Sequence, residues 1–372
     1  MRIIVVAPKN KTVFNFRGDL IKDMIAKGNE VLVIGPNKDY LDDVMKLGIK
    51  EFIEVPLIKD NTNVFGDLKY LKSLRTIFKE KKPDMVFSYT IKPVIYGSIA
   101  AQSAKVPNIY AMITGLGRVY ASQSYKAKFI RFITKNLYKM AFKSCKKVIF
   151  QNRDDINEFV AQKYLPENKC VQVNGSGVNM ERFAKADLPD SPVFLMVSRI
   201  IKEKGVIEYC EAARNVKKEH PEARFILLGG FDKSIGALKK EDIQQYIDDG
   251  SVEFPGEVKD PVAYYQNSSV FVLPSYYREG LPRTILEAMS CGRTIITTDW
   301  PGCREPIQDN VNGFLVPVKD ANALATKMKF LIQNPEELKI MSDAAYVTCQ
   351  GKYEVSKINN AMNDVMKYQK SS

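Results

Sequence analysis

Two glutamates eight residues apart, Glu279 and Glu287, are the side chains whose types and spacing point most directly to chemistry. Glu279 follows an apolar run, 269–274, that predicts a buried strand. Glu287 falls inside a helix that Pro282 opens, since proline suits a first helical turn. Gly280 leaves room for a ligand beside the backbone, and the N–H groups of a helix start bind anions such as a diphosphate. A carboxylate one turn further in can accept hydrogen bonds from two neighbouring hydroxyls. The segment therefore predicts a nucleotide-sugar site.

Paired carboxylates also belong to a second chemistry, that of the glycoside hydrolases, which use one as an acid and the other as a base or nucleophile. Two glutamates at this spacing also occur in helices that bind nothing. The pair alone leaves all three interpretations open, and the rest of the sequence must separate them.

Several other reaction classes lack the residues that they need. The chain has one histidine, His220, so a histidine-based triad and an H-E-x-x-H zinc site are both excluded. No G-x-x-x-x-G-K-[ST] loop is present, and no Asp-x-Asp pair suits a metal, so we expect neither a metal nor a cofactor. The six cysteines show no paired spacing, and the apolar stretch 3–7 is too short for a signal peptide or a membrane span. A reduced, cytoplasmic protein is expected.

Charge is divided unevenly along the chain. Residues 1–180 contain 30 Lys+Arg against 16 Asp+Glu, a net charge of +14. Residues 181–372 contain 25 against 27, a net charge of −2, which recovers the +12 of the whole chain. No acidic residue occurs between Asp84 and Asp154. We therefore expect the N-terminal half to meet an anionic partner.

Short β-rich runs alternate with amphipathic helical stretches, which predicts parallel α/β sheets, and 372 residues are too many for one core. We expect a basic, membrane-facing first domain over residues 1–178 and a second domain over 190–352. The last segment, 353–372, would pack back on the first domain as a helix, and 174–192 would hold the linker. The expected strands are 2–7, 30–34, 52–55, 84–88, 108–113, 147–150 and 171–174, then 193–198, 224–228, 252–254, 269–273, 294–298 and 313–316.

A basic stretch, residues 125–147, contains eight Lys+Arg and no acid. Arg131, Lys135, Lys139 and Lys143 recur every four residues and so form one stripe on a helix, beside an apolar flank. One interpretation is a surface helix whose apolar side packs on the sheet, and the other is a helix whose cations meet an anionic bilayer. The two interpretations are compatible if the apolar side packs on the sheet and only the cations face lipid. No nucleic-acid-binding pattern is present, so nucleic acid is not an expected partner.

Five segments of the C-terminal half, taken together, are far more specific than the carboxylate pair. They are Ser198-Arg-Ile-Ile-Lys-Glu-Lys-Gly205, the strand ends 225–230 and 252–256, the long segment 273–292 around both glutamates, Thr298-Asp-Trp-Pro-Gly-Cys-Arg-Glu305 and Asn312-Gly-Phe-Leu-Val316. In this order they resemble the donor domain of glycosyltransferase family 4. That resemblance implies a retaining enzyme of the GT-B fold, with two Rossmann-like, doubly wound domains facing a central cleft.

Four segments of the first half narrow the resemblance. They are Phe14-Asn-Phe-Arg17, Tyr89-Thr-Ile-Lys-Pro-Val-Ile-Tyr-Gly97, Ile113-Thr-Gly-Leu-Gly117 and Asn174-Gly-Ser-Gly-Val-Asn179. They are similar to bacterial capsular and surface-polysaccharide members of the family. The similarity implies an acceptor sugar on a polyprenyl diphosphate carrier, presented at the cytoplasmic face of the membrane.

The resemblance also implies roles for residues of the donor domain. Arg199 and Lys204 would neutralise the leaving diphosphate, since a guanidinium fork suits two oxygens and a lysine supplies a point charge. Glu279 would orient hydroxyls of the transferred sugar, and Glu287 would bind the ribose. The other donor-binding candidates are Gly280, Leu281, Pro282, Arg283, Gly229 and Gly256.

For the acceptor, the resemblance points to Arg17 and Lys92 near a diphosphate, and to Thr114, Gly115 and Gly117 after a strand, where glycine lets substrate approach the backbone. Many family members have a histidine beside the reacting sugar at this place. Here Thr114 stands there, which leaves a hydroxyl or a backbone carbonyl. The first loop, residues 8–12, also lacks the glycines of the family form.

The sequence therefore predicts a glycosyltransferase that moves a hexose or N-acetylhexosamine from a UDP-sugar to a polyprenyl-diphosphate-linked saccharide in capsule, O-antigen or other surface-glycan assembly. It would act at the inner face of the plasma membrane, as a peripheral protein. A GT-B sugar-nucleotide epimerase would need acid and base residues of its own in the cleft, and a hydrolase would need neither Arg199 nor Lys204. A non-catalytic membrane-surface binding protein would leave the carboxylate and phosphate loops unexplained.

Overall fold

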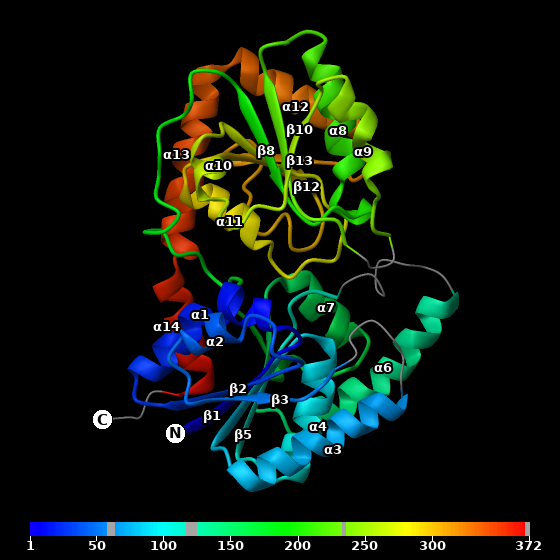
Figure 1. The fold of residues 1–372 in the computed structure, drawn as a ribbon, viewed down its shortest axis with the longest axis vertical. Helices are drawn as coiled ribbons and strands as arrows, with labels where there is room; N and C mark the ends of the chain where they lie inside the picture. The colour runs from blue at the N-terminus through cyan, green and yellow to red at the C-terminus, as the bar shows by residue number, and fades with distance from the viewer. Residues whose placement is uncertain (58–63, 117–124, 233–235, 369–372) are drawn as a thin grey trace. The chain divides into compact units, whose positions relative to one another are not determined.

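The chain forms two α/β units, each built around one parallel sheet (Figure 1). The computed structural model describes residues 1–57, 64–116, 125–232 and 236–368, and of residues 125–133 it describes the backbone alone. The first unit comprises Met1–Ser176 with Ser356–Ser372, and the second comprises Gly177–Val355.

The first sheet has the order β3-β2-β1-β4-β5-β6-β7, with every neighbouring pair parallel. Its central strands read as unbroken apolar runs because helices cover both faces, and Ile3 to Val6 of β1 are fully buried. The strands are β1 (Arg2–Val6), β2 (Glu30–Gly35), β3 (Glu51–Glu54), β4 (Met85–Tyr89), β5 (Asn108–Met112), β6 (Lys147–Phe150) and β7 (Cys170–Gln172).

Helices on the two faces of this sheet bury separate cores. Apolar residues of α3 (Val64–Lys81), η1 (Pro93–Gly97), α4 (Ser98–Ser103), α6 (Tyr125–Lys143) and α7 (Arg153–Ala161) share one core with the sheet. Those of α1 (Asn10–Ala26), α2 (Leu41–Met45) and α14 (Val355–Met366) share the other. The last helix reaches this core through Ile358, Met362 and Met366, spaced four residues apart on one face. A short turn, η2 (Glu167–Lys169), precedes β7.

The second sheet has the order β10-β9-β8-β11-β12-β13 and is also wholly parallel. Its strands are β8 (Val193–Val197), β9 (Arg224–Leu228), β10 (Glu253–Gly256), β11 (Val270–Leu273), β12 (Thr294–Thr298) and β13 (Gly313–Val316). The chain leaves β8 toward β9 on one side and resumes at β11 on the other, so the gap between β8 and β11 is the switch point of a doubly wound sheet.

The helices of the second unit are η3 (Lys202–Lys204), α8 (Val206–Lys217), α9 (Lys240–Asp248), α10 (Val262–Gln266), α11 (Arg283–Ser290), α12 (Ala321–Gln333) and α13 (Pro335–Lys352). α8 contacts α9 and α12, whereas α11 contacts α10 and α13. Together with the strands they enclose one large apolar core.

Each strand expected from the sequence is present, with its ends displaced by no more than two residues. The expected linker differs, because most of residues 177–192 is fixed to the second unit. Phe183 is buried against Tyr265, with 5.8 Å between the ring centroids, and Arg293 donates to the carbonyl oxygens of Ala186 and Asp187. The second unit therefore begins at Gly177 and not at residue 190.

Candidate active site

The loops that follow β8 and β11 lie at the switch point of the second sheet, where the carboxyl ends of neighbouring strands meet and ligands of such sheets bind. The first loop, 198–205, contains Arg199 and Lys204, and the second, 274–282, contains Glu279. The two expected phosphate-binding cations and the first glutamate thus come together on adjacent strand ends.

Backbone contacts hold these two loops against each other. The Tyr276 N–H donates to the Glu203 carbonyl oxygen at 2.9 Å, and the Ser275 hydroxyl donates to the same oxygen at 3.3 Å. Gly205 has a φ of 76°, and a Cβ there would collide with the Pro274 carbonyl oxygen. Only glycine satisfies both demands, so the close approach of the loops depends on this residue.

Lys204 and Glu279 form an ion pair in this interface. The Lys204 Nζ contacts Glu279 Oε1, and both side chains are largely buried. The Ser275 hydroxyl lies 3.5 Å from the same carboxylate oxygen, and the Tyr277 ring centroid lies 5.9 Å from the Lys204 nitrogen. The lysine is thereby held at the strand end next to Glu279.

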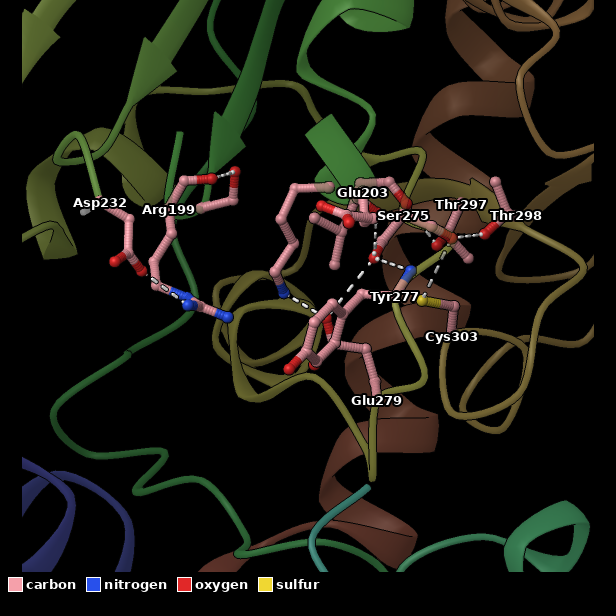
Figure 2. Close-up of polar contacts among 12 residues, drawn as sticks. Arg199, Glu203, Asp232, Ser275, Tyr277, Glu279, Thr297, Thr298 and Cys303 are labelled. Atoms are coloured by element: carbon pink, nitrogen blue, oxygen red, sulfur yellow. Dashed lines mark hydrogen bonds and ion pairs between the residues drawn. The ribbon is translucent and has the colours of Figure 1, made fainter. Parts of the chain in front are cut away.

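Arg199 is held in a similar way, by a carboxylate and by the ring of Tyr277. Its Nη1 donates to Asp232 Oδ2 at 2.7 Å, and its guanidinium lies 5.7 Å from the centroid of the Tyr277 ring. Although burial opposes it, the hydrogen bond with Asp232 raises the pKa of the guanidinium above its usual value. Figure 2 shows Arg199 and Asp232 on one side of the Tyr277 ring, with Ser275, Thr298 and Cys303 on the other.

The end of β12 and the loop that follows it contact the segment that carries Glu279. The Thr298 hydroxyl donates to the Ser275 carbonyl oxygen, and Thr297 donates to that of Leu273 at 2.7 Å. Gly302, with a φ of 84°, lets this loop approach the carbonyl oxygens of Glu279 and Gly280, which a Cβ would meet at 2.6 Å. The sequence did not single out Gly302 or Asp232, because such supporting contacts join segments that are far apart in the chain.

Glu287 lies one turn inside α11, which begins at Arg283 with Pro282 at its N-cap. The Tyr265 hydroxyl donates to Glu287 Oε2 at 2.9 Å, and Arg283 Nε lies 3.2 Å from Oε1. Burial raises the pKa of the carboxyl, while Arg283 and Tyr265 oppose that shift. Glu287 is thus a buried carboxylate that accepts a hydrogen bond from Tyr265 on one oxygen and forms an ion pair with Arg283 through the other.

The remaining donor-binding candidates lie in the loop before α11 and at the ends of β9 and β10. Gly280 and Leu281 are buried in the loop before Pro282. Gly229 and Gly256 end neighbouring strands, and the Gly229 N–H donates to the Gly256 carbonyl oxygen at 3.0 Å. A Cβ on Gly229 would collide with the Ser198 carbonyl oxygen, so this glycine lets the strand end that carries Arg199 pack closely.

The acceptor candidates lie in the first unit, around its own switch point between β1 and β4. Arg17 is 4% exposed, with its guanidinium 5.3 Å from the centroid of the Tyr89 ring. The Tyr89 hydroxyl is 2.9 Å from that of Thr12, and burial raises the pKa of Tyr89 to about 12. Lys92 donates to Asp67 at 2.8 Å.

The last candidates selected from the sequence are the acceptor residues after β5 and the cations of α6. Thr114 and Gly115 are half-buried, and Gly115 has a φ of 107°. Gly117 lies outside the described residues, and so does the side chain of Arg131. On the same helix Lys135 is half-buried, whereas Lys139 and Lys143 are exposed.

The described part of the chain holds no group of three or more His, Cys, Asp or Glu side chains arranged to bind a metal ion. None of its helices combines the length and the apolar character that crossing a bilayer requires.

Two sequence families match adjoining parts of the chain: glycosyl transferases group 1 over residues 179–348, and glycosyl transferase 4-like over residues 2–152. The chain is 31% identical, over 91% of each sequence, to the N,N'-diacetylbacillosaminyl-diphospho-undecaprenol alpha-1,3-N-acetylgalactosaminyltransferase of Campylobacter jejuni. It is 29% identical to the UDP-Gal:alpha-D-GlcNAc-diphosphoundecaprenol alpha-1,3-galactosyltransferase of Escherichia coli, over 83% of this chain and 80% of that protein.

One solved structure, Anabaena Alr3699/HepE in complex with UDP, matches with a TM-score of 0.79 at 17% identity, covering 99% of this chain and 100% of that one. A likeness at this identity concerns the fold. It confirms the expected GT-B class, in which two doubly wound α/β domains follow one another along the chain.

Proposed function

This chain belongs to the group 1, family 4 glycosyltransferases, and on that premise we propose that it transfers a hexose or N-acetylhexosamine from a UDP-sugar to a saccharide on a polyprenyl diphosphate. The proposed reaction retains the anomeric configuration and serves surface-glycan assembly. Two relatives support the acceptor class, since their names specify diphospho-undecaprenol sugars. The Escherichia coli relative is named for a UDP-linked galactose donor.

The observation that carries the donor half of the proposal is the pair of cations at the switch point of the second sheet. A departing UDP gains negative charge on its diphosphate, and fixed positive groups stabilise that charge in the transition state. Arg199 offers a planar fork and Lys204 a point charge, and they lie 5.7 Å and 5.9 Å from the centroid of the Tyr277 ring. In this proposal the diphosphate displaces the Asp232 carboxylate from Arg199, and it shares Lys204 with the Glu279 carboxylate.

Glu279 would then orient the sugar. Its carboxylate is fixed by Lys204 and lies beside the Ser275 hydroxyl, so it would accept hydrogen bonds from sugar hydroxyls next to the bond that breaks. The proposed departure is on the front face, with the leaving phosphate accepting the proton of the acceptor hydroxyl. Such a step needs no enzymatic nucleophile with an activating base.

Glu287 would bind the ribose. A carboxylate held by Tyr265 and Arg283 is already in one orientation, which reduces the entropic cost of binding two vicinal hydroxyls. We propose that no metal and no cofactor takes part, because the two cations and the α11 helix start supply the positive potential. Transfer should then be equally fast with and without a chelator.

For the acceptor we propose contacts from Arg17 and Lys92 to the carrier diphosphate. Thr114, Gly115 and Gly117 would lie near the acceptor sugar. The exposed Lys139 and Lys143 of α6 have no carboxylate partner among the described residues, which suits a helix that meets anionic headgroups. The enzyme would thus work in the cytoplasm, peripherally bound to the inner face of the plasma membrane.

The proposal is tested first by nucleotide binding. The purified protein is heated with UDP, GDP, ADP or CMP, and then with a panel of UDP-sugars. A ligand at about 100 times its dissociation constant stabilises the folded state by roughly 2.7 kcal/mol, which raises the unfolding temperature by several degrees. We expect a shift with UDP alone, and the UDP-sugar with the largest shift is then assayed for transfer.

Other outcomes would replace the proposal. A shift with GDP or ADP in place of UDP would overturn the donor assignment. A protein that responds to no nucleotide would be a hydrolase or a non-catalytic membrane binder. Interconversion of two UDP-sugars without an acceptor would identify an epimerase.

A further inference from the structure

The first turn of α3 exposes three large apolar side chains to solvent. Phe65 is 87% exposed, Val64 is 67% exposed and Leu68 is 56% exposed. A single exposed leucine is ordinary in a soluble protein. Three neighbouring apolar side chains, one of them an almost fully exposed phenylalanine, mark a surface that another body covers.

The same face of α3 continues as a row of cations. Lys69, Lys72, Arg75 and Lys79 follow Phe65 and Leu68 at intervals of three and four residues, so all six side chains line one side of the helix. All four cations are exposed, and none has a carboxylate partner among the described residues. The opposite side of the helix packs into the core through Tyr70, Leu74 and Phe78.

The surroundings of this face are also basic. α4 contacts both α3 and α6, so the three helices belong to one layer on the same side of the first sheet (Figure 1). On α6, Lys139 and Lys143 are exposed, and Met140 is 54% exposed. No acidic residue occurs in the sequence from 85 to 153, which includes both α4 and α6. The only acids on α3 are Asp67, which is paired with Lys92, and Glu80 at its far end.

We infer that the outer face of α3 is a membrane anchor, in which Val64, Phe65 and Leu68 enter the headgroup region of an anionic bilayer and the cations that follow bind its phosphates. Apolar side chains at one end of a helix and unpaired cations along the rest match the two parts of such a surface. A second copy of the chain fits this face poorly, because a symmetric contact would bring two basic surfaces together. A nucleic acid would use the cations and leave the apolar turn uncovered.

The anchor is tied directly to the proposed acceptor site. Asp67, on the first turn of α3, accepts hydrogen bonds from Lys92 Nζ at 2.8 Å and from the Tyr96 hydroxyl at 3.0 Å. Lys92 follows β4 at the switch point of the first sheet. A helix end inserted among headgroups would therefore lie beside the residue proposed to contact the carrier diphosphate. This step rests on the proposed function, whereas lipid binding itself does not.

The test measures binding of the full chain to vesicles, by co-sedimentation. Vesicles of phosphatidylglycerol with phosphatidylcholine are compared with vesicles of phosphatidylcholine alone. The first variant, Phe65→Ser with Leu68→Ser, should weaken binding to the anionic vesicles by at least about tenfold, since it removes two inserted side chains. The second, Lys69→Gln with Lys72→Gln, should weaken it by about thirtyfold at low salt and by much less at high salt.

A matched control uses the second unit. Ile340 and Val347 on α13 are 60% and 63% exposed, and Ile340→Ser with Val347→Ser also removes two exposed apolar side chains without touching α3. This control should bind vesicles like the wild type. Because all the substituted side chains face solvent, the unfolding temperature should stay unchanged in each variant, and this is checked for all of them.

Two results would overturn the anchor. One is vesicle binding by the Phe65→Ser, Leu68→Ser variant equal to that of the wild type. The other is a wild-type dimer in sedimentation equilibrium that this variant converts to a monomer, since a second copy would then be the occupant.

The UDP thermal shift separates the anchor from the proposed function. If the shift is absent while the variants lose vesicle binding as described, the transferase proposal fails and the anchor stands. If the shift is present while vesicle binding is unaltered, the reverse holds.

Discussion

The two sheets have the same order of their first six strands, 3-2-1-4-5-6, when each is numbered from its own first strand. The cations of the two units differ, however, in whether they have carboxylate partners. In the second unit Arg199 and Lys204 are each paired with a carboxylate at the switch point. In the first unit the exposed cations of α3 and α6 have no carboxylate partner among the described residues. A site that binds and releases a small anion works with counter-ions that exchange, whereas a surface that faces an extended anionic body does not need them. One scaffold thus carries a site and a docking surface.

The largest expected effect tests the paired cations. Lys204→Ala should lower kcat/KM for transfer by about 100- to 1000-fold, as expected when one charge-stabilising group is lost from a transition state. Steady-state kinetics with saturating acceptor would measure it. The matched control is Lys202→Ala, an exposed lysine two residues away, which should retain wild-type rates. Equal losses in both variants would show that the effect is not specific to Lys204 and would remove its proposed role.

A smaller loss, of UDP affinity, is expected when Glu287 is replaced. Glu287→Ala removes an acceptor of charged hydrogen bonds, each contributing roughly 1.5–3 kcal/mol, so UDP itself should bind about 10- to 100-fold more weakly. Calorimetric titration with UDP and with the UDP-sugar would measure this. Tyr265→Phe keeps the carboxylate and removes one of its donors, so it should weaken UDP by less. Unchanged UDP affinity in Glu287→Ala would remove the ribose role.

The unpaired cations of α6 give the next effect. Charge reversal by Lys135→Glu with Lys139→Glu should weaken binding to anionic vesicles by at least about 2 kcal/mol, since each cation near the surface contributes about 1 kcal/mol. The loss should shrink as salt rises. Binding that is unaltered at low salt would leave α6 as a packing helix and place all membrane contact on α3.

The smallest effect concerns the counter-ion of Arg199. Asp232→Asn keeps the size of the side chain and removes its charge, so the UDP diphosphate no longer competes with a carboxylate for the guanidinium. Since a half-exposed ion pair contributes about 1 kcal/mol or less, UDP affinity should rise by a few-fold. Weaker UDP binding would instead show that Asp232 holds Arg199 in its binding orientation. The proposal that the UDP diphosphate replaces the Asp232 carboxylate at Arg199 would then be wrong.

Much of the fold could be predicted from local pattern. Runs such as 193–197 and 270–273 are apolar, β-rich and bounded by loop residues, and this is sufficient because a strand covered on both faces must be apolar along its length. The linker was less predictable. Phe183 and the residues around it have the proline-containing, irregular sequence that is typical of a linker. They are nevertheless held by Tyr265 and Arg293, which lie far along the chain.

The candidate site shows the same division. Arg199, Lys204 and Glu279 were selected by motif, because their types and spacing match a known family. Asp232 was not, and Gly302, although it lies inside the segment 298–305, was given no role, since both contribute through contacts that no local spacing encodes. The exposed face of α3 was not predicted, because the tertiary contacts decide which side of a helix packs on the sheet.

The sequence by itself determined the two α/β layers, the family and the residues that can carry the donor chemistry, because all three depend on local composition and on short motifs. Tertiary structure decided which charges are paired and which apolar side chains remain exposed. Lys204 meets Glu279, 75 residues away, only when β8 and β11 lie side by side. Phe65 remains exposed because Tyr70, Leu74 and Phe78 turn the opposite face of α3 toward the sheet. Charge pairing and exposure follow from proximity in space, which a linear pattern does not specify.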